Sequence, residues 1–246
     1  MREDSLGDRM KGYERAARSA LPRRMPVILR IDGKGFHGVT RGCDKPFDEH
    51  LMGLMNMTAI RVCSEAQGAV LGFVQSDEIS ILLHNYKRLQ SEAWFDNEVQ
   101  KLVSVAAGIA SGWFSREWTG PVAFDCRAFV LPEAEVCNYF IWRQQDATRN
   151  SIQMATRAVY SHRDVDGKDT SEMQELLHAK GINWNDYPTG CKRGRAIVRK
   201  TFEREGTIRS AWVVEPPPIF TADRDYVEKW LAVESDAECM SKAGEK

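Results

Sequence analysis

Two acids, Asp77 and Glu78, lie side by side between apolar segments at 69–75 and 79–84. Burying a carboxylate is unfavourable unless it is paired with a cation or binds a metal ion. A third acid, Asp32, ends another apolar segment, VILRID. Hard cations such as Mg²⁺ prefer carboxylate oxygens, so these acids are candidates for metal-dependent phosphoryl or nucleotidyl transfer. The alternative is an ordinary acidic turn exposed to water.

The segments around these acids predict a mixed fold. Four short, largely apolar segments have the character of strands: 27–32, 69–75, 79–84 and 122–132. Three segments are predicted helices, the first on helical spacing of apolar residues: 48–66, 91–113 and 133 to about 161. The resulting βαββαβ order predicts an α+β, ferredoxin-like fold, in which an antiparallel sheet carries helices on one face.

This topology would bring the three acids together. The first and third strands of a βαββαβ sheet are usually neighbours, and the turn SDE joins the second strand to the third. Asp32 is therefore expected beside Asp77 and Glu78. Side chains alternate along a strand, so residues 77 and 78 would point to opposite faces if both were extended. We expect one of them to bind metal directly and the other to support it or bind through water.

The loop after Asp32 carries glycines and cations. Its G-x-G-x-x-G pattern at 33–38 does not lead directly into a helix as a dinucleotide-binding motif should, because VTRGCDKPF intervenes. A glycine-rich loop can instead bring backbone N–H groups close to phosphates. Four side chains of the loop are suitable counter-charges for a triphosphate, or else solvated surface residues: Lys34, His37, Arg41 and Lys45.

We interpret residues 1–132 as a catalytic core with an N-terminal helix, and residues 133–246 as an extension packed on it. The extension is expected to add three elements: a helix over 171–179, a hairpin over about 195–214 and a C-terminal helix after PPP. Its densest basic run, 191–200, is either a phosphate contact or a solvated edge. The helix face with Trp142, Arg143 and Arg149 could bind RNA or another subunit.

The composition excludes several classes of protein. Apolar residues make up 43% of the 246 residues, so a disordered chain is excluded. Its 34 basic and 35 acidic residues argue neither for nor against nucleic acid. The six cysteines form no C-x-x-C pair, which argues against zinc and predicts a reduced, cytoplasmic protein. No apolar run approaches the ~18 residues of a membrane helix, so no membrane partner is expected.

Longer segments then occur together in one order: RIDGKGFH, KPFDE, QSDEIS, WFDNEVQKLVS, FDCRAFVLP, NYFIWRQQDATRNSIQMA and GINWNDYPTGCKRG. Over about residues 8–200 the sequence resembles the tRNA-His guanylyltransferase family. It is most similar to the bacterial and phage-type guanylyltransferase-like members of that family. The combination of segments is specific, whereas any one of them alone is not.

The resemblance implies a polymerase-type palm that works in the reverse direction and adds nucleotides to the 5′ end of tRNA. A 5′-monophosphate is first activated with ATP or GTP. The 3′-hydroxyl of an incoming nucleoside triphosphate, commonly GTP, then attacks, and the nucleoside monophosphate leaves. Two Mg²⁺ ions would serve both steps. The resemblance also implies a homotetramer that binds the 5′ end and acceptor stem of tRNA.

The resemblance also implies roles for individual positions. The metal ligands would be the side chains of Asp32 and Asp77 and the backbone carbonyl of Gly33. The catalytic acids would be Asp32, Asp77 and Glu78. The nucleotide would be bound by a set drawn from both loops: Asp32, Gly33, Lys34, Gly35, Phe36, His37, Lys45, Ser76 and Asp77.

One departure from the family bears on the substrate. Eukaryotic members carry H-I-N-N after the W-R-Q segment, linked to recognition of histidine tRNA, and here positions 148–151 read TRNS. This favours template-dependent repair of 5′-truncated tRNA by Watson–Crick pairing. The alternative is dedicated addition of guanosine at position −1.

Two further alternatives belong to other classes. A non-catalytic RNA-binding module would not need the three acids, and it would want surface aromatics that VILRID and ISILLH lack. A nucleotide cyclase on the same scaffold would not explain the family's segments after residue 132.

Overall fold

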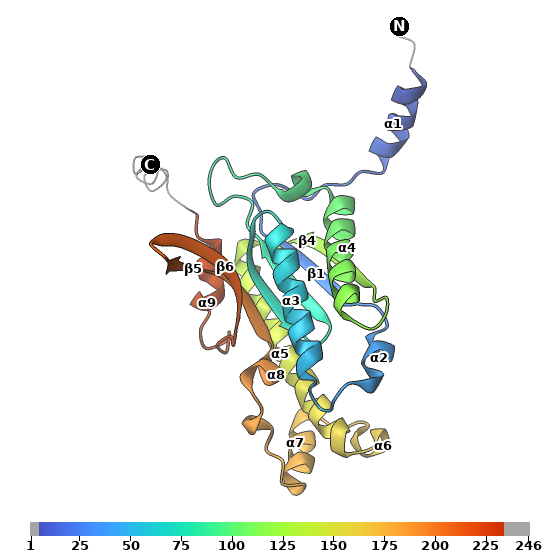
Figure 1. Ribbon diagram of the computed structural model, residues 1–246, viewed down its shortest axis with the longest axis vertical. Coiled ribbons are helices and arrows are strands. Elements are labelled where there is room, and N and C mark those ends of the chain that lie inside the picture. Colours follow the sequence, from blue (N-terminus) through green and yellow to red (C-terminus); the bar gives the residue numbers. More distant parts are fainter. Residues whose placement is uncertain (1–4, 234–246) are drawn as a thin grey trace.

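The computed structural model describes residues 5–233 (Figure 1). Within that range, six strands form one antiparallel sheet in the order β4-β1-β3-β2-β5-β6. The strands are β1 (Val27–Gly33), β2 (Ala69–Gln75), β3 (Glu78–Leu83), β4 (Phe124–Val130), β5 (Arg195–Arg204) and β6 (Thr207–Glu215). The first four have the 4-1-3-2 order of a ferredoxin-like sheet, which confirms the predicted fold class. The hairpin β5–β6 extends this sheet beyond β2.

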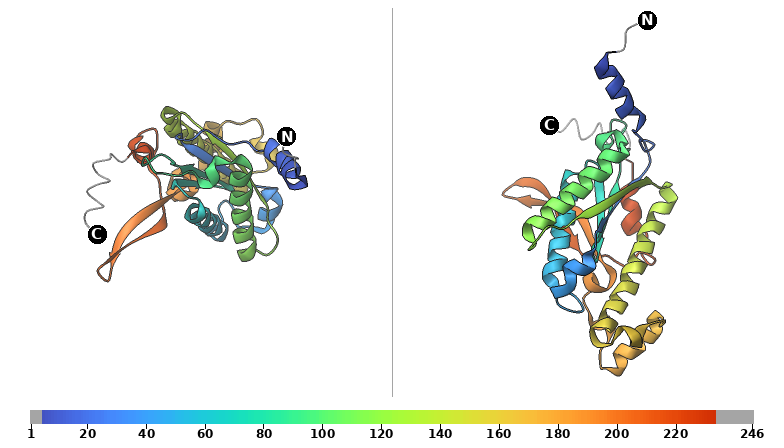
Figure 2. Two further views of the ribbon diagram at one scale, coloured as in Figure 1. Left: turned by 90° about the horizontal axis from the view of Figure 1, so that it is seen from above. Right: turned by 90° about the vertical axis from the view of Figure 1, so that its right-hand side faces the viewer.

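Helices cover both faces of the sheet (Figure 2). On one face lie α3 (Glu49–Glu65) and α4 (Val99–Glu117), and on the other lies the 27-residue α5 (Glu133–Val159). The expectation of helices on one face therefore holds only for the βαββαβ unit, because α5 of the extension covers the second face. The remaining helices are short: α1 (Leu6–Ala16), α2 (Phe36–Val39), α6 (His162–Val165), α7 (Thr170–Ala179), α8 (Thr189–Arg193) and α9 (Asp225–Glu228).

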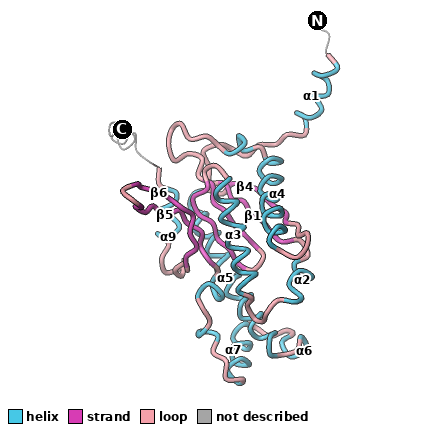
Figure 3. The backbone as a smooth tube through the Cα atoms, viewed as in Figure 1, coloured by secondary structure: helices cyan, strands magenta, loops and turns pink. Residues whose placement is uncertain are grey.

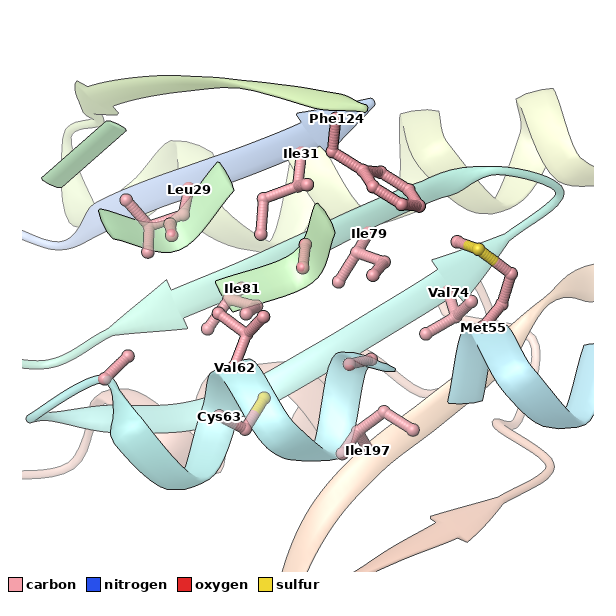
Figure 4. Close-up of a cluster of buried hydrophobic side chains, with 14 of the residues drawn as sticks. Leu29, Ile31, Met55, Val62, Cys63, Val74, Ile79, Ile81, Phe124 and Ile197 are labelled. Carbon is pink, nitrogen blue, oxygen red and sulfur yellow. The ribbon is translucent and has the colours of Figure 1, made fainter. Parts of the chain in front are cut away.

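The core is accordingly two-sided, which explains why the central strands are apolar along their whole length. In β1, Leu29 and Ile31 pack with α3 and α4 in the cluster drawn in Figure 4. Ile28 points the other way and packs with Phe140 of α5. A sheet covered on both faces needs apolar residues at successive positions rather than in alternation. The segment after residue 132 thus shares its core with the segment before it.

Two predicted boundaries differ from the structure for local reasons. The segment after Asp32, expected as a loop, contains α2 and a 3₁₀ turn (Thr40–Gly42) because Phe36 is buried against Phe114 and Phe124. The helix expected from residue 91 begins only at Val99. Residues 95–97 before it have positive φ angles, which an α-helix does not accommodate.

Two parts of the chain extend away from the body. The helix α1 has no buried residue and is joined to β1 by an extended loop (Figure 3). The outer part of the β5–β6 hairpin is exposed along both strands. The predicted C-terminal helix corresponds to α9 and a 3₁₀ turn (Lys229–Leu231), and its positions after 233 lie outside the described residues. No helix in the described range is long and apolar enough to cross a membrane.

Gly194, just before β5, allows a tight approach to β2. Its φ of 78° is unfavourable for residues with a side chain, and an added Cβ would lie 2.4 Å from the Phe73 ring. We expect Gly194→Ala to lose roughly 1–2 kcal/mol for the backbone and about 1–3 kcal/mol more for overpacking. Gly206 has a similar φ of 72° but open space around its Cα, so Gly206→Ala is the matched control. Urea denaturation of both variants tests this, and equal losses would contradict it.

Candidate active site

The register of the central strands brings the predicted acids together. Asp32 at the end of β1 lies opposite Glu78 of β3 on one side and opposite Asp125 of β4 on the other. The backbone N–H of Gly33 donates to the carbonyl of Asp77 at 3.2 Å. Asp77 lies in a two-residue turn with Ser76, whose φ is 47°. Residues 45 positions apart in sequence thus become neighbours at one end of the sheet.

Asp32 and Asp77 are carboxylates without a balancing cation. Burial raises the pKa of Asp32, and the charges of Asp77, Glu78 and Asp125 raise it further, whereas the charge of Arg30 opposes the rise. Burial also raises the pKa of Asp77, with the charge of Glu78 adding to it and a hydrogen bond from Ser76 opposing it. Within residues 5–233 neither acid forms an ion pair. Ionising both is therefore unfavourable until a cation binds.

This pair of acids fits magnesium better than metals that need a full set of protein ligands. In the described part of the chain, no three His, Cys, Asp or Glu side chains form a metal-binding group. Mg²⁺ usually takes only one or two carboxylates and completes its octahedron with water and substrate phosphates. Asp32 and Asp77, with a backbone carbonyl such as that of Gly33, are suitable oxygen donors.

Glu78 is in a different situation from the other two acids. It is 5% exposed, and its Oε2 accepts hydrogen bonds from Arg30 Nε at 2.9 Å and Arg30 Nη2 at 2.5 Å. Arg143 Nη1 donates to both carboxylate oxygens at 3.0 Å. Arg143 is only 2% exposed and comes from α5. The carboxylate of Glu78 is thus occupied by two guanidinium groups.

The same ion pair ties the acidic turn to α5. Arg143 Nη1 also lies 3.4 Å from Asp146 Oδ2, and that oxygen accepts from Gln75 Nε2 at 3.2 Å. Asn150 Nδ2 donates to Asp146 Oδ2 at 3.3 Å. Gln75 is the last residue of β2, directly before the turn. A polar network therefore fixes the turn against the helix that covers the second face.

A pocket of about 350 Å³ lies beside this turn. Three predicted nucleotide-binding residues line it: His37, Lys45 and Ser76. Apart from Gln75, which precedes the turn, the other lining residues come from three separate segments, 40–52, 147–157 and 190–195. They include side chains that the sequence interpretation did not assign to the nucleotide: Thr40, Cys43, Asp44, Asp48, Asn150, Arg157 and Arg195. Of these, Asp48 has a recognisable local role, because it is the N-cap of α3 and its carboxylate accepts from Leu51 N–H at 2.8 Å.

The other predicted loop residues lie outside this pocket. Phe36 is 5% exposed, and its ring packs in the core, so its side chain is not available to a nucleotide. The same ring occupies the space beside Gly33, where an added Cβ would lie 2.1 Å from it. Gly35 has a φ of 67° and starts α2. Lys34 is exposed, and its N–H donates to Ala123 C=O at 2.8 Å.

Arg195 belongs to the basic run 191–200, for which the sequence left open a phosphate contact or a solvated edge, and it lines the pocket. It is 7% exposed, and it donates from Nε to Asn56 Oδ1 at 2.6 Å and from Nη1 to Gly190 C=O at 3.0 Å. Its Nη2 is buried without a hydrogen-bond partner. Burial lowers its pKa to about 10, so it stays protonated at neutral pH. Arg195 therefore gives the pocket a buried positive charge, and within residues 5–233 it forms no ion pair.

The basic run 191–200 does not act as one surface. Lys192 is buried, and its Nζ donates to the Asn185 carbonyl at 2.5 Å. Arg199 and Lys200 are exposed on β5 and bind Ser210 and Glu215 of β6. The run is therefore divided among a structural lysine, the pocket and the hairpin.

An antiparallel ferredoxin-like sheet with acids at the end of its central strands, beside a pocket of about 350 Å³, is compatible with the palm-type nucleotidyltransferase that the sequence resemblance implies. The sequence profile of the tRNAHis guanylyltransferase family matches residues 7–132. The tRNA(His) guanylyltransferase of Schizosaccharomyces pombe is 31% identical over 218 residues, covering 80% of this chain and 81% of that protein. The chain belongs to the tRNA(His) guanylyltransferase family.

Solved structures agree with this assignment. A bacterial tRNA(His) guanylyltransferase-like protein in complex with ATP is 45% identical, with a TM-score of 0.86 over 93% of this chain and 99% of that one. Such a protein in complex with GTP is 46% identical, with a TM-score of 0.84 and the same coverage. The tRNA(His) guanylyltransferase of Saccharomyces cerevisiae shares the fold, with a TM-score of 0.67 at 23% identity, covering 86% of this chain and 98% of that one.

The uncompensated charge of Asp77 has a measurable consequence. Its raised pKa means that ionising Asp77 costs more in the folded than in the unfolded protein, so this cost is absent at low pH, appears as the pH rises above the unfolded-state pKa, and is complete above the raised folded-state pKa. We expect Asp77→Asn to raise the metal-free melting temperature at neutral pH by a few degrees. We also expect it to abolish the stabilisation that Mg²⁺ gives the wild type. Thermal scans with EDTA and with Mg²⁺ test both effects, and an unchanged Mg²⁺ response would contradict the ligand role.

Glu78 should behave in the opposite way. Glu78→Gln leaves the buried Arg143 with only its longer contact to Asp146, at 3.4 Å, and removes the partner of Arg30, so we expect a loss of about 3–5 kcal/mol. The response to Mg²⁺ should remain. Glu117→Gln is the control, because Glu117 pairs with Arg116 at the surface, where a loss below about 1 kcal/mol is expected. Loss of the Mg²⁺ response without loss of stability would instead make Glu78 a direct metal ligand.

Proposed function

We propose that this protein adds nucleotides in the 3′–5′ direction to the 5′ end of tRNA in a Mg²⁺-dependent reaction, as template-dependent repair. The observation that carries the proposal is the pair of acids Asp32 and Asp77, which lie together without an ion-pair partner in the described residues. Asp77 shares its turn with Ser76, which lines the pocket. Family membership and the relatives in complex with ATP and GTP support the same reaction class.

The proposed reaction has two displacement steps. In the first, an oxygen of the tRNA 5′-phosphate attacks the α-phosphorus of ATP or GTP, and pyrophosphate leaves. In the second, the 3′-hydroxyl of an incoming nucleoside triphosphate attacks the activated 5′-phosphate, and the nucleoside monophosphate leaves. When bound, two Mg²⁺ ions would stabilise the attacking and leaving oxygens. Each step ends with one phosphoester or phosphoanhydride bond formed and one broken.

Different residues of this chain would have different roles in this reaction. Asp32 and Asp77, with the Gly33 carbonyl, would hold the metal ions at the end of β1 and β3. His37 and Lys45 line the pocket on the side of the glycine-rich loop, where they would neutralise a triphosphate. Ser76 would contact the nucleotide beside the acids. Glu78 would position the turn through Arg30 and Arg143 and would not touch the nucleotide.

The substrate preference rests on positions 148–151. Thr148 Oγ1 donates to the Gln144 carbonyl at 3.0 Å, and Ser151 Oγ donates to the Lys192 carbonyl at 3.1 Å. The Arg149 guanidinium pairs with Asp146 on its own helix. Asn150 Nδ2 donates to Asp146 Oδ2 at 3.3 Å. All four side chains are thus held by the protein itself, which supports selection by base pairing rather than by contacts specific to histidine tRNA. The homotetramer and the cytoplasmic location stay predictions.

The decisive experiment uses a 5′-labelled, 5′-monophosphorylated tRNA that lacks its first nucleotide. It is incubated with ATP, Mg²⁺ and each nucleoside triphosphate in turn. We expect the wild type to add only the nucleotide complementary to position 72. Asp77→Ala should lose at least about 100-fold in rate, because the metal would be held by one carboxylate fewer.

Glu117→Gln serves as the control protein, since Glu117 lies on the surface of α4. Addition of guanosine alone, and only to full-length histidine tRNA, would show dedicated −1 addition, the activity named for the S. pombe relative. Binding of tRNA without any addition would overturn the enzyme proposal in favour of a binding module.

A further inference from the structure

Trp142 is a large aromatic residue on the surface of α5, 48% exposed. Its helical neighbours Tyr139 and Arg143 are buried, at 8% and 2% exposure. The Arg143 guanidinium lies 3.4 Å from the centroid of the Trp142 ring, and the Arg30 guanidinium lies 5.5 Å from it. Tyr139 meets the ring edge-on at 5.9 Å. The ring is therefore held in one orientation while nearly half of the residue remains open to water.

This ring lies close to the candidate catalytic acids. Arg30, which it contacts, is two residues before Asp32 on β1, and residues two apart on a strand share a face about 6.6–6.8 Å apart. The charge of Arg30 acts on Asp32, which is consistent with this proximity. The exposed aromatic surface thus lies beside the acids, on the face of the sheet that α5 covers.

The surroundings of Trp142 favour a nucleobase over another protein as its partner. Its other neighbours one turn away on α5 are all polar: Asn138 and Gln145 are exposed, and Asp146 is partly buried. A protein interface would need a broader apolar core around the tryptophan. A single base needs only one aromatic face, and stacking on such a face is the usual way that proteins hold unpaired bases.

Arg30 and Arg143, which contact the ring, are not available to bind phosphates. Both pair with Glu78, and Arg143 also contacts Asp146, so their charges are already neutralised. Their role at Trp142 is to fix the ring. A fixed ring loses little entropy when a base stacks on it.

We propose that Trp142 is a stacking platform for the nucleobase of the 5′-terminal nucleotide of the RNA, which places the 5′-phosphate at Asp32 and Asp77. This inference rests on the proposed function. Trp142 is a positioning residue in it, because the ring touches the base and not the reacting atoms.

The test compares two RNAs, a 5′-truncated tRNA and the same tRNA with an abasic 5′-terminal nucleotide. Wild type, Trp142→Ala and Trp142→Phe are measured for the RNA dissociation constant, KM and kcat. For the normal RNA we expect Trp142→Ala to weaken binding and raise KM by about 5- to 150-fold, and Trp142→Phe to stay near wild type. For the abasic RNA, wild type and Trp142→Ala should bind equally weakly. Tyr13→Ala, which removes an exposed aromatic from α1, is the control and should leave all values unchanged.

Any of three results would contradict the stacking role of Trp142. It fails if the wild type binds normal and abasic RNA equally well, if Trp142→Ala weakens binding of both RNAs by the same factor, or if Trp142→Ala changes the oligomeric state in light scattering. The comparison of the two RNAs on the wild type does not need a stable variant. If the wild type adds no nucleotide but prefers the RNA that carries the base, the proposed function fails while the platform stands.

Discussion

The positions of Asp32, Asp77 and Glu78 depend on the antiparallel register between β1 and β3. In that register Asp32 lies opposite Glu78, and Arg30 is near enough to bind the Glu78 carboxylate. A slip of one residue would turn the apolar side chains of β3 to the wrong face and move Glu78 into the cluster of α3 and α4. Because both faces of the sheet are buried, such a slip is very unfavourable. The positions of the acids are therefore fixed by apolar packing along the whole strand pair.

The three acids share one location but are balanced differently. Glu78 has two arginines, one from the neighbouring strand and one from α5, and a buried carboxylate with such partners is stable. Asp32 and Asp77 form no ion pair within residues 5–233, and burial together with the neighbouring acids raises their pKa values. Arg30 and Arg143 are thus both bound to Glu78, the acid that holds the turn in place. The two remaining acids keep an unbalanced negative charge, which is the property that binding a divalent cation requires.

Much of the fold could be predicted from the sequence because its signals are local. Apolar runs and a tight turn are enough to predict β1, β2 and β3, and the usual ferredoxin-like order places Asp32 beside Asp77. The role of Glu78 could not be predicted in this way, because Arg143 lies 65 residues further along the chain. Nor could the burial of Phe36, since one aromatic in a glycine-rich segment has no periodicity to indicate its direction. The pocket combines distant segments of the chain, so the basic run that contains Arg195 could be recognised from the sequence, but its place in the pocket wall could not.

The charges around the pocket complement each other across its two sides. The acids at the turn lack a cation, whereas Lys45 forms no ion pair within residues 5–233 and Arg195 keeps one buried N–H group unpaired. A site with only one of these features would bind a metal ion or an anion alone. A nucleoside triphosphate with its magnesium carries both charges on one ligand, and it would relieve both sides at once. The fold has an unfavourable arrangement of charge on each side of the pocket, and the proposed substrate is the chemical species that neutralises the two together.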